Sequence, residues 1–150
     1  MKRKLLSSHA RIGIINRGEA AVRFIRAAKE FNTLYGTQFE TVAFYLDTEN
    51  DALFVKEADH AFALASFAGF SELTGSAYLN CPFLLNAIQQ TKCAGVWVGW
   101  GFVAENADFA ALLEQHELVL IGPTAEAMDS LGDKIKAKDI ADRSNVPTCP

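Results

Sequence analysis

The sequence predicts an α/β domain in which a mostly parallel sheet is covered by helices on both faces. Short apolar runs alternate along the chain with longer segments of helical period. This alternation indicates crossover connections, which place neighbouring strands parallel to one another. The runs are apolar almost throughout, as expected of strands with no face exposed to water. Ligands of such sheets bind beyond the carboxyl ends of the strands.

The first half of the chain contains three of the predicted strands. RIGIIN at 11–16 is a short apolar run followed by a turn, which is typical of a buried strand. Residues 18–33 collect their apolar side chains on one side at helical spacing and are predicted to form a helix. ETVAFYL at 40–46 is the second strand, and the turn-rich DTEND that follows leads into a short helix at 51–57. AFAL at 61–64 is the third strand.

The second half continues the same alternation. Residues 66–78 hold glycines and several Ser and Thr residues and are predicted as a loop, before a helix at 80–91. GVWVG at 95–99 is the fourth strand, and a helix is expected at 104–116. LVLIG at 118–122 is the fifth strand. This order of strands and helices is Rossmann-like.

We expect three parts along the chain. Residues 1–10 are basic at their start, lack the apolar core of a signal peptide, and are predicted to form a disordered arm. Residues 11–123 form the α/β domain. Residues 124–150 are predicted as a helical linker, with helices at 124–131 and 133–144, and the final NVPTCP is typical of an entry into further chain.

The composition argues against several classes of function. The net charge of −4 and the lack of a basic block give no reason to expect a nucleic-acid partner. No apolar run approaches the roughly 18 residues of a membrane helix. The cysteines are odd in number and form no C-x-x-C, which favours a reducing cytoplasm, and no histidine lies at metal-ligand spacing from them. These residues are Cys81, Cys93, Cys149, His9, His60 and His116.

The turn after the first strand, INRGEAAVR, is neither G-x-G-x-x-G nor a Walker A loop. Asn16 and Gly18 can form a tight turn that directs backbone N–H groups outward at a helix start, where Glu19 suits the helix dipole. The alternative is an ordinary strand-to-helix turn without a ligand.

Arg23, Arg26 and Glu30 fall on one face of the predicted first helix. One interpretation is a solvated charged face with a single i, i+4 ion pair, worth about a few tenths of a kcal/mol. The other is a contact between subunits. The residues by themselves leave both interpretations open.

The segment LGDKIKAKD at 131–139 places a lysine against the local electrostatics. Asp133 can cap a helix that begins after Gly132. Lys134 then lies in the first turn, where the helix dipole disfavours a cation. This placement suits an anion site in which the lysine and the helix N-terminus share a phosphate. The alternative is an ordinary set of surface lysines, namely Lys134, Lys136 and Lys138.

The segment GVWVGWGFVAEN at 95–106 begins as a strand and then changes character. Gly99 and Gly101 fall where the strand must end, and they allow a sharp turn or a close approach to a ligand. Trp100 between them is expected to point out of the sheet and to form a wall for a planar ligand. Trp97, inside the strand, is predicted to pack in the core.

Several segments together resemble the N-terminal domain of biotin carboxylase, the ATP-grasp enzyme of biotin-dependent carboxylases. The resemblance covers nearly all of residues 11–150, and its blocks keep the family's order and spacing. It implies the Rossmann-like, pre-ATP-grasp fold. The matching segments are INRGEAAVRFIRAAKE, EADHAFAL, SAYLN, GWGFVAENADFA, IGPTAEAM, LGDKIKAKDIA and NVPTCP.

The resemblance implies an ATP-dependent ligase that uses Mg²⁺ and bicarbonate to carboxylate biotin on a carrier protein or domain, together with a carboxyltransferase. Lys134 matches the lysine that contacts the ATP phosphates. Gly99, Trp100 and Gly101 match the loop beside the biotin ring. The positions of Arg23, Arg26 and Glu30 form the homodimer contact in bacterial members. The family's catalytic and metal-binding residues lie beyond residue 150, so residues 1–150 alone are expected to be inactive.

The loop also departs from the bacterial H-P-G-Y-G pattern. The segment G-V-W-x-G-W-G is closer to the large multidomain acetyl-CoA carboxylases, whereas NRGE and FVAENADFA resemble bacterial members. Two alternatives stay open. One is the front domain of another ATP-grasp ligase, similar to carbamoyl phosphate synthetase, against which the NRGE and GDK blocks argue. The other is a binding or assembly module without catalytic activity.

Overall fold

The computed structural model describes residues 5–149, whose strands form one five-stranded sheet in the order β3-β2-β1-β4-β5. Each neighbouring pair of strands is parallel, which confirms the predicted α/β class. The strands are β1 (Arg11–Ile14), β2 (Glu40–Tyr45), β3 (His60–Ala63), β4 (Gly95–Trp97) and β5 (Val119–Leu120). The helices are α1 (Gly18–Tyr35), α2 (Leu53–Glu57), α3 (Cys81–Gln90), α4 (Ala107–Gln115), α5 (Ala125–Gly132) and α6 (Lys134–Arg143).

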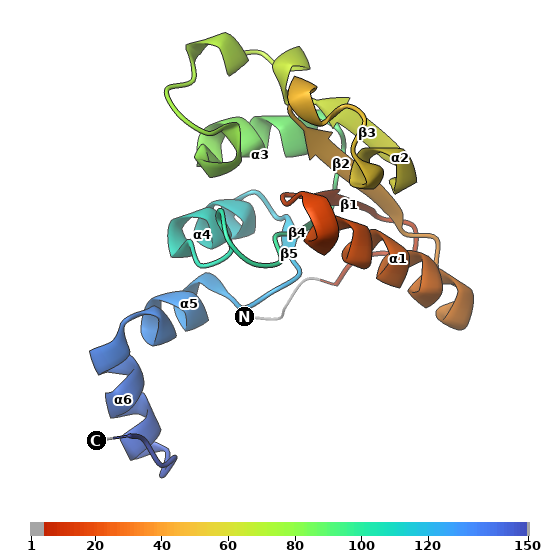
Figure 1. The fold of residues 1–150 in the computed structure, drawn as a ribbon. Coiled ribbons are helices and arrows are strands. Elements are labelled where there is room, and N and C mark those ends of the chain that lie inside the picture. The colour runs from red at the N-terminus through yellow and green to blue at the C-terminus, as the bar shows by residue number, and fades with distance from the viewer. Residues whose placement is uncertain (1–4, 150) are drawn as a thin grey trace.

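Helices cover both faces of the sheet (Figure 1). Successive strand residues point to opposite faces, so Ile14 packs with α1 and α2 while Ile15 packs with α3 and α4. Along β2, Val42 and Phe44 lie on the α3–α4 side and Ala43 lies on the α1–α2 side. This two-sided burial is the reason that the strands read as nearly continuous apolar runs.

The structure corrects the boundaries of the fourth strand and of the helix after it. The strand ends at Trp97, and α4 begins at Ala107 instead of residue 104. Phe102 has a left-handed backbone with φ of 46°, so the chain turns before a helix can start. Asn106 then caps α4, because its side chain accepts a hydrogen bond from Phe109 N at 2.8 Å.

The predicted arm, residues 1–10, extends partly outside the described residues. Its described part contacts the sheet: Gln38 N donates to the Ser8 carbonyl at 2.7 Å, and Glu40 N donates to the Ala10 carbonyl at 3.1 Å. Leu6 lies so close to Gly95 that a Cβ on this glycine would be 2.9 Å from its Cδ1. In the part of the predicted disordered arm that the structure describes, Leu6, Ser8 and Ala10 therefore contact the domain.

Helices α5 and α6 extend away from the sheet (Figure 1). α5 packs on the domain through Ala125 and Met128, which are partly buried against the main core cluster. Neither α5 nor α6 contains a fully buried residue. None of the helices in residues 5–149 combines the length and apolar character that crossing a membrane requires.

Candidate functional site

The carboxyl ends of β1 and β4 lie side by side, because Ile14 pairs with Trp97 in the parallel register. Ile15 N continues this pairing by donating to the Trp97 carbonyl at 2.9 Å. The turn after β1 is thereby placed next to the loop after β4. This is the edge at which parallel sheets bind their ligands.

Asn16 holds the loop after β4 through hydrogen bonds from its buried side chain. Its Nδ2 donates to the Val98 carbonyl and to the Trp100 carbonyl, both at 2.8 Å. Its Oδ1 accepts from Arg17 N at 2.8 Å. The side chain amide thus uses both of its N–H groups on the loop, and only 4% of the residue is exposed.

The sequence predicted Asn16 only as a former of the first turn. Its partners lie 82 and 84 residues away, and no local pattern encodes such a contact. The available signal was an amide residue at the end of a buried strand, since a buried amide requires hydrogen-bond partners.

The loop after β4 makes the sharp turn that Gly99 and Gly101 predicted. Gly99 and Gly101 adopt φ values of 63° and 73°, in the left-handed region that glycine favours. A Cβ on Gly99 would lie 2.6 Å from Cη2 of Trp97, so the indole closes directly against the backbone there.

The two tryptophans divide as predicted in exposure. Trp97 is partly buried and stacks on Phe24 of α1, with ring centroids 4.5 Å apart and planes 15° apart. Trp100 is 72% exposed, which leaves a flat apolar ring at the edge of the sheet. A ring held in this way by its backbone can lie against a planar ligand.

The second predicted binding residue, Lys134, opens α6. Asp133 caps this helix as predicted, with Oδ1 accepting from Ile135 N at 2.8 Å and from Lys136 N at 3.0 Å. These backbone hydrogen bonds lower the pKa of the Asp133 carboxyl. Lys134 is exposed, and no hydrogen bond or ion pair within residues 5–149 joins it to the loop after β4.

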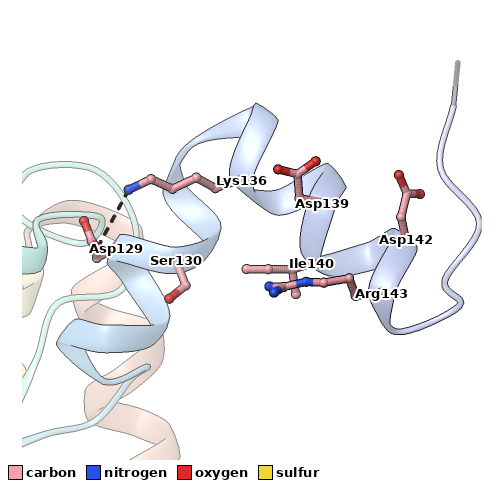
Figure 2. Close-up of a pocket in the computed structure, with 7 residues that line it drawn as sticks. All are labelled: Asp129, Ser130, Lys136, Asp139, Ile140, Asp142 and Arg143. Carbon is pink, nitrogen blue, oxygen red and sulfur yellow. Dashed lines mark ion pairs between the residues drawn. The ribbon is translucent and has the colours of Figure 1, made fainter.

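An open hollow of about 520 Å³ lies between α5 and α6 (Figure 2). Lys136 reaches across from α6 toward Asp129 of α5, with Nζ 3.9 Å from Oδ2. Lys134 is not among the lining residues, so this hollow is separate from the predicted phosphate contact. The lining residues are Asp129, Ser130, Lys136, Asp139, Ile140, Asp142 and Arg143.

The charged face of α1 contains one i, i+4 ion pair, between Glu19 and Arg23, whereas Arg26 pairs with a residue of another helix. Arg26 makes a two-pronged ion pair with Glu57 of α2, at 2.9 and 2.6 Å, instead of pairing with Glu30. This pair lowers the pKa of Glu57 and raises that of Arg26. Arg23 pairs one turn back with Glu19 at 3.1 Å. The face is exposed to solvent, and Arg26 also ties α1 to α2.

The fold and this edge define a Rossmann-like α/β domain that presents a glycine-bounded aromatic loop beside the turn after its first strand. The chain belongs to the family described as the biotin carboxylase, N-terminal domain, whose model matches residues 8–128.

The relatives agree with this assignment. The chain is 38% identical over 137 residues to biotin carboxylase 1 of Bacillus subtilis, covering 91% of this chain and 28% of that protein. It is 35% identical over 140 residues to the human mitochondrial propionyl-CoA carboxylase alpha chain, covering 93% of this chain and 18% of the relative.

Solved structures resemble the fold closely. The biotin carboxylase domain of a single-chain bacterial carboxylase superposes with a TM-score of 0.78 at 37% identity, over 94% of this chain and 30% of that one. The biotin carboxylase domain dimer of Hydrogenobacter thermophilus 2-oxoglutarate carboxylase, solved with MgADP and bicarbonate, superposes with a TM-score of 0.79 at 33% identity, over 94% and 28%. The chain therefore spans less than a third of the proteins that it matches.

Proposed function

We propose that this chain is the N-terminal part of a biotin carboxylase, an ATP-dependent ligase that carboxylates carrier-bound biotin with ATP and bicarbonate. The observation that carries the proposal is the loop Gly99–Gly101, fixed to the first strand by the buried side chain of Asn16. Such a loop keeps one aromatic ring, Trp100, at a defined place on the edge where these sheets bind ligands. Family membership supports biotin as the planar ligand.

Each predicted site residue has a separate role in this proposal. Trp100 provides the wall against which the biotin ring lies, and the missing side chains of Gly99 and Gly101 let the ring approach the backbone. Lys134, at the start of α6, approaches the ATP phosphates as a positive point charge. We assign no residue of this chain to bond making.

The magnesium that accompanies ATP is not assigned to this chain. Residues 5–149 contain no group of three or more His, Cys, Asp or Glu side chains able to hold a metal ion. We expect the isolated chain of 150 residues to be inactive, and any bicarbonate-dependent ATP cleavage by it would contradict this expectation.

The proposed partners follow from the family. They are a biotin carboxyl carrier protein or domain and a carboxyltransferase, as in a biotin-dependent enzyme such as acetyl-CoA carboxylase. We also propose a homodimer contact through Arg23, Arg26 and Glu30, in which Arg26 would reach a partner only by sharing or leaving Glu57. The free thiols Cys81, Cys93 and Cys149 support a cytoplasmic location.

A chimera tests the function. This chain replaces the matching segment of biotin carboxylase 1 of Bacillus subtilis, and ATP cleavage that depends on bicarbonate and biotin is measured. We expect activity, and Trp100→Ala should raise the KM for biotin about tenfold, equivalent to about 1.4 kcal/mol of binding. Trp100→Tyr should restore most of the affinity, because it keeps a flat ring.

The same chimera separates the two binding residues. Lys134→Ala should raise the KM for ATP and leave that for biotin unchanged, whereas Lys138→Ala further along α6 serves as a matched control without effect. Normal ATP affinity and turnover in Lys134→Ala would remove Lys134 from the site. A folded chimera without any activity would favour a binding or assembly module.

A further inference from the structure

A buried tyrosine lies beneath the same edge of the sheet. Tyr78 is 1% exposed, and its hydroxyl lies 2.8 Å from the Phe44 carbonyl and 2.9 Å from Oε2 of Glu49. Burial, followed by the neighbouring carboxylate, raises the pKa of Tyr78, so the hydroxyl keeps its proton and remains a donor. A single buried proton thus faces two acceptors.

Glu49 joins this tyrosine to the turn after β1. Its Oε2 also accepts from Leu46 N at 2.9 Å, just after β2, and its Oε1 pairs with Nη1 of Arg17 at 3.1 Å. The Glu49 side chain is 11% exposed, against 56% for Arg17. The carboxylate is therefore a nearly buried centre with partners from three separate segments, and such a connected network fixes its members firmly.

Phe102 contacts two members of this network, Tyr78 and Arg17. Its ring lies against the Tyr78 ring, with centroids 4.9 Å apart, and Cζ of Arg17 lies 5.9 Å from its centre. Its backbone φ of 46° is unfavourable for a bulky residue and persists only where the surroundings hold it. Phe102 directly follows Gly101, so its position sets where the loop Gly99–Gly101 ends.

We propose that Arg17, Glu49 and Tyr78 are positioning residues that hold Phe102 and thereby aim Trp100 at its ligand. Two consecutive residues then fix the loop: Asn16 through the carbonyls of Val98 and Trp100, and Arg17 through the ring of Phe102. That the ligand is biotin rests on the proposed function, whereas the positioning itself does not depend on it.

Fluorine NMR tests the positioning directly. The chain contains two tryptophans, so 5-fluorotryptophan gives two signals, and Trp100→Phe assigns them. Tyr78→Phe, which keeps the ring and removes the hydroxyl, and Glu49→Gln, which keeps the shape and removes the charge, should each shift or broaden the Trp100 signal. The Trp97 signal, from the ring stacked on Phe24, should stay in place.

Two further variants complete the test. Glu40→Gln breaks an Arg–Glu pair of the same kind between Glu40 and Arg11, and it should leave both signals unchanged. Arg17→Gln changes a side chain that is more than half exposed and keeps the test open if the buried variants fail to fold; it should again move Trp100 alone. An unchanged Trp100 signal in folded Arg17→Gln and in every folded variant of Glu49 or Tyr78 overturns the proposal, as does a shift of both signals alike.

Kinetics in the chimera separate this proposal from the proposed function. Misplacing Trp100 should raise the KM for biotin about tenfold, because small errors in position are costly, and should leave the KM for ATP unchanged. A moved Trp100 signal with an unchanged KM for biotin supports the positioning and counts against the biotin role. An unmoved signal refutes the positioning whatever the kinetics.

Discussion

The loop after β4 and the turn before α6 each carry a predicted binding residue, but the chain holds them by different means. The loop is tied to the core from two sides, by the hydrogen bonds of Asn16 and by the stack of Trp97 on Phe24. The aromatic ring at its tip is exposed, while the side chain of Asn16 is buried and the rings of Trp97 and Phe24 are partly buried. Its geometry is therefore set within this chain.

The turn before α6 depends on local contacts. Asp133 caps the helix, but neither α5 nor α6 contains a buried residue. α5 is connected to α4 by a hydrogen bond from Ala125 N to Glu114 Oε1 at 3.1 Å and by apolar packing. The difference teaches that the proposed biotin wall is positioned by side chains of the domain core, whereas the proposed phosphate contact lies on a surface helix that contains no buried residue.

The largest expected effect on stability falls on Asn16. Asn16→Ala removes the donor of a buried carbonyl, that of Val98, and of a partly buried one, that of Trp100; a buried group left without a partner costs about 1–3 kcal/mol. We expect the free energy of unfolding to fall by about 3–4 kcal/mol in urea denaturation. Asn86→Ala, which removes an amide bonded only to Gln90 on the surface of α3, is the control and should change it by less than about 0.5 kcal/mol. Equal losses in both variants would show that the loop is not held from β1.

A pair of glycine variants tests the other side of the loop. Gly99→Ala combines the strain of a left-handed alanine with a Cβ 2.6 Å from Trp97, and we expect it to cost about 2–3 kcal/mol. Gly101→Ala has the same backbone strain but nothing within 4 Å of its Cβ, so it should cost only about 1 kcal/mol. The difference between the two, measured by thermal unfolding, reports the contacts of the new Cβ with Trp97 and, at 3.1 Å, with Nδ2 of Asn16.

A double variant checks this interpretation. Trp97→Leu removes the ring that lies nearest the new methyl group and leaves only the 3.1 Å approach to Nδ2 of Asn16. Adding Gly99→Ala to Trp97→Leu should therefore cost clearly less than Gly99→Ala alone and only a little more than Gly101→Ala. If Gly99→Ala remained as costly in that background, the indole would not be what constrains the loop.

Features with a local signal could be predicted from the sequence. The alternation of apolar runs and helical segments predicted all five strands, because doubly covered strands must be apolar on both faces. The Asp133 cap and the turn at Gly99 and Gly101 could also be predicted. Helix caps and left-handed turns depend on a few adjacent residues, so the local sequence contains their signal.

Features that join distant segments could not be predicted in this way. One of the two open interpretations of the charged face involved an ion pair along the helix itself, yet the partner of Arg26 is Glu57, 31 residues away. The start of α4 was placed three residues early, because nothing local indicates that Phe102 is held in a left-handed turn by packing against Tyr78. The scaffold of the loop depends on such distant contacts, whereas the cap beside Lys134 does not.

The smallest expected effect concerns that cap and its response to pH. The folded-state pKa of Asp133 is lowered from its ordinary value of 3.8 by hydrogen bonds from Lys136 N and Ile135 N. A lowered carboxyl pKa means that the stabilisation is complete above the unfolded value and is lost as the pH falls through the folded one. The amide signals of Ile135 and Lys136 in ¹H–¹⁵N NMR should therefore titrate together with a midpoint below 3.8.

Asp133→Asn sharpens the result, because asparagine caps a helix without carrying a charge. In that variant the two amide signals should no longer follow an acid titration, while the helix remains. Asp139→Asn removes a charge from the middle of α6 and should leave the titration in place. A midpoint at or above 3.8, or a titration that survives Asp133→Asn, would mean that the turn before Lys134 is held by something other than its cap, and the contrast with the loop after β4 would then weaken.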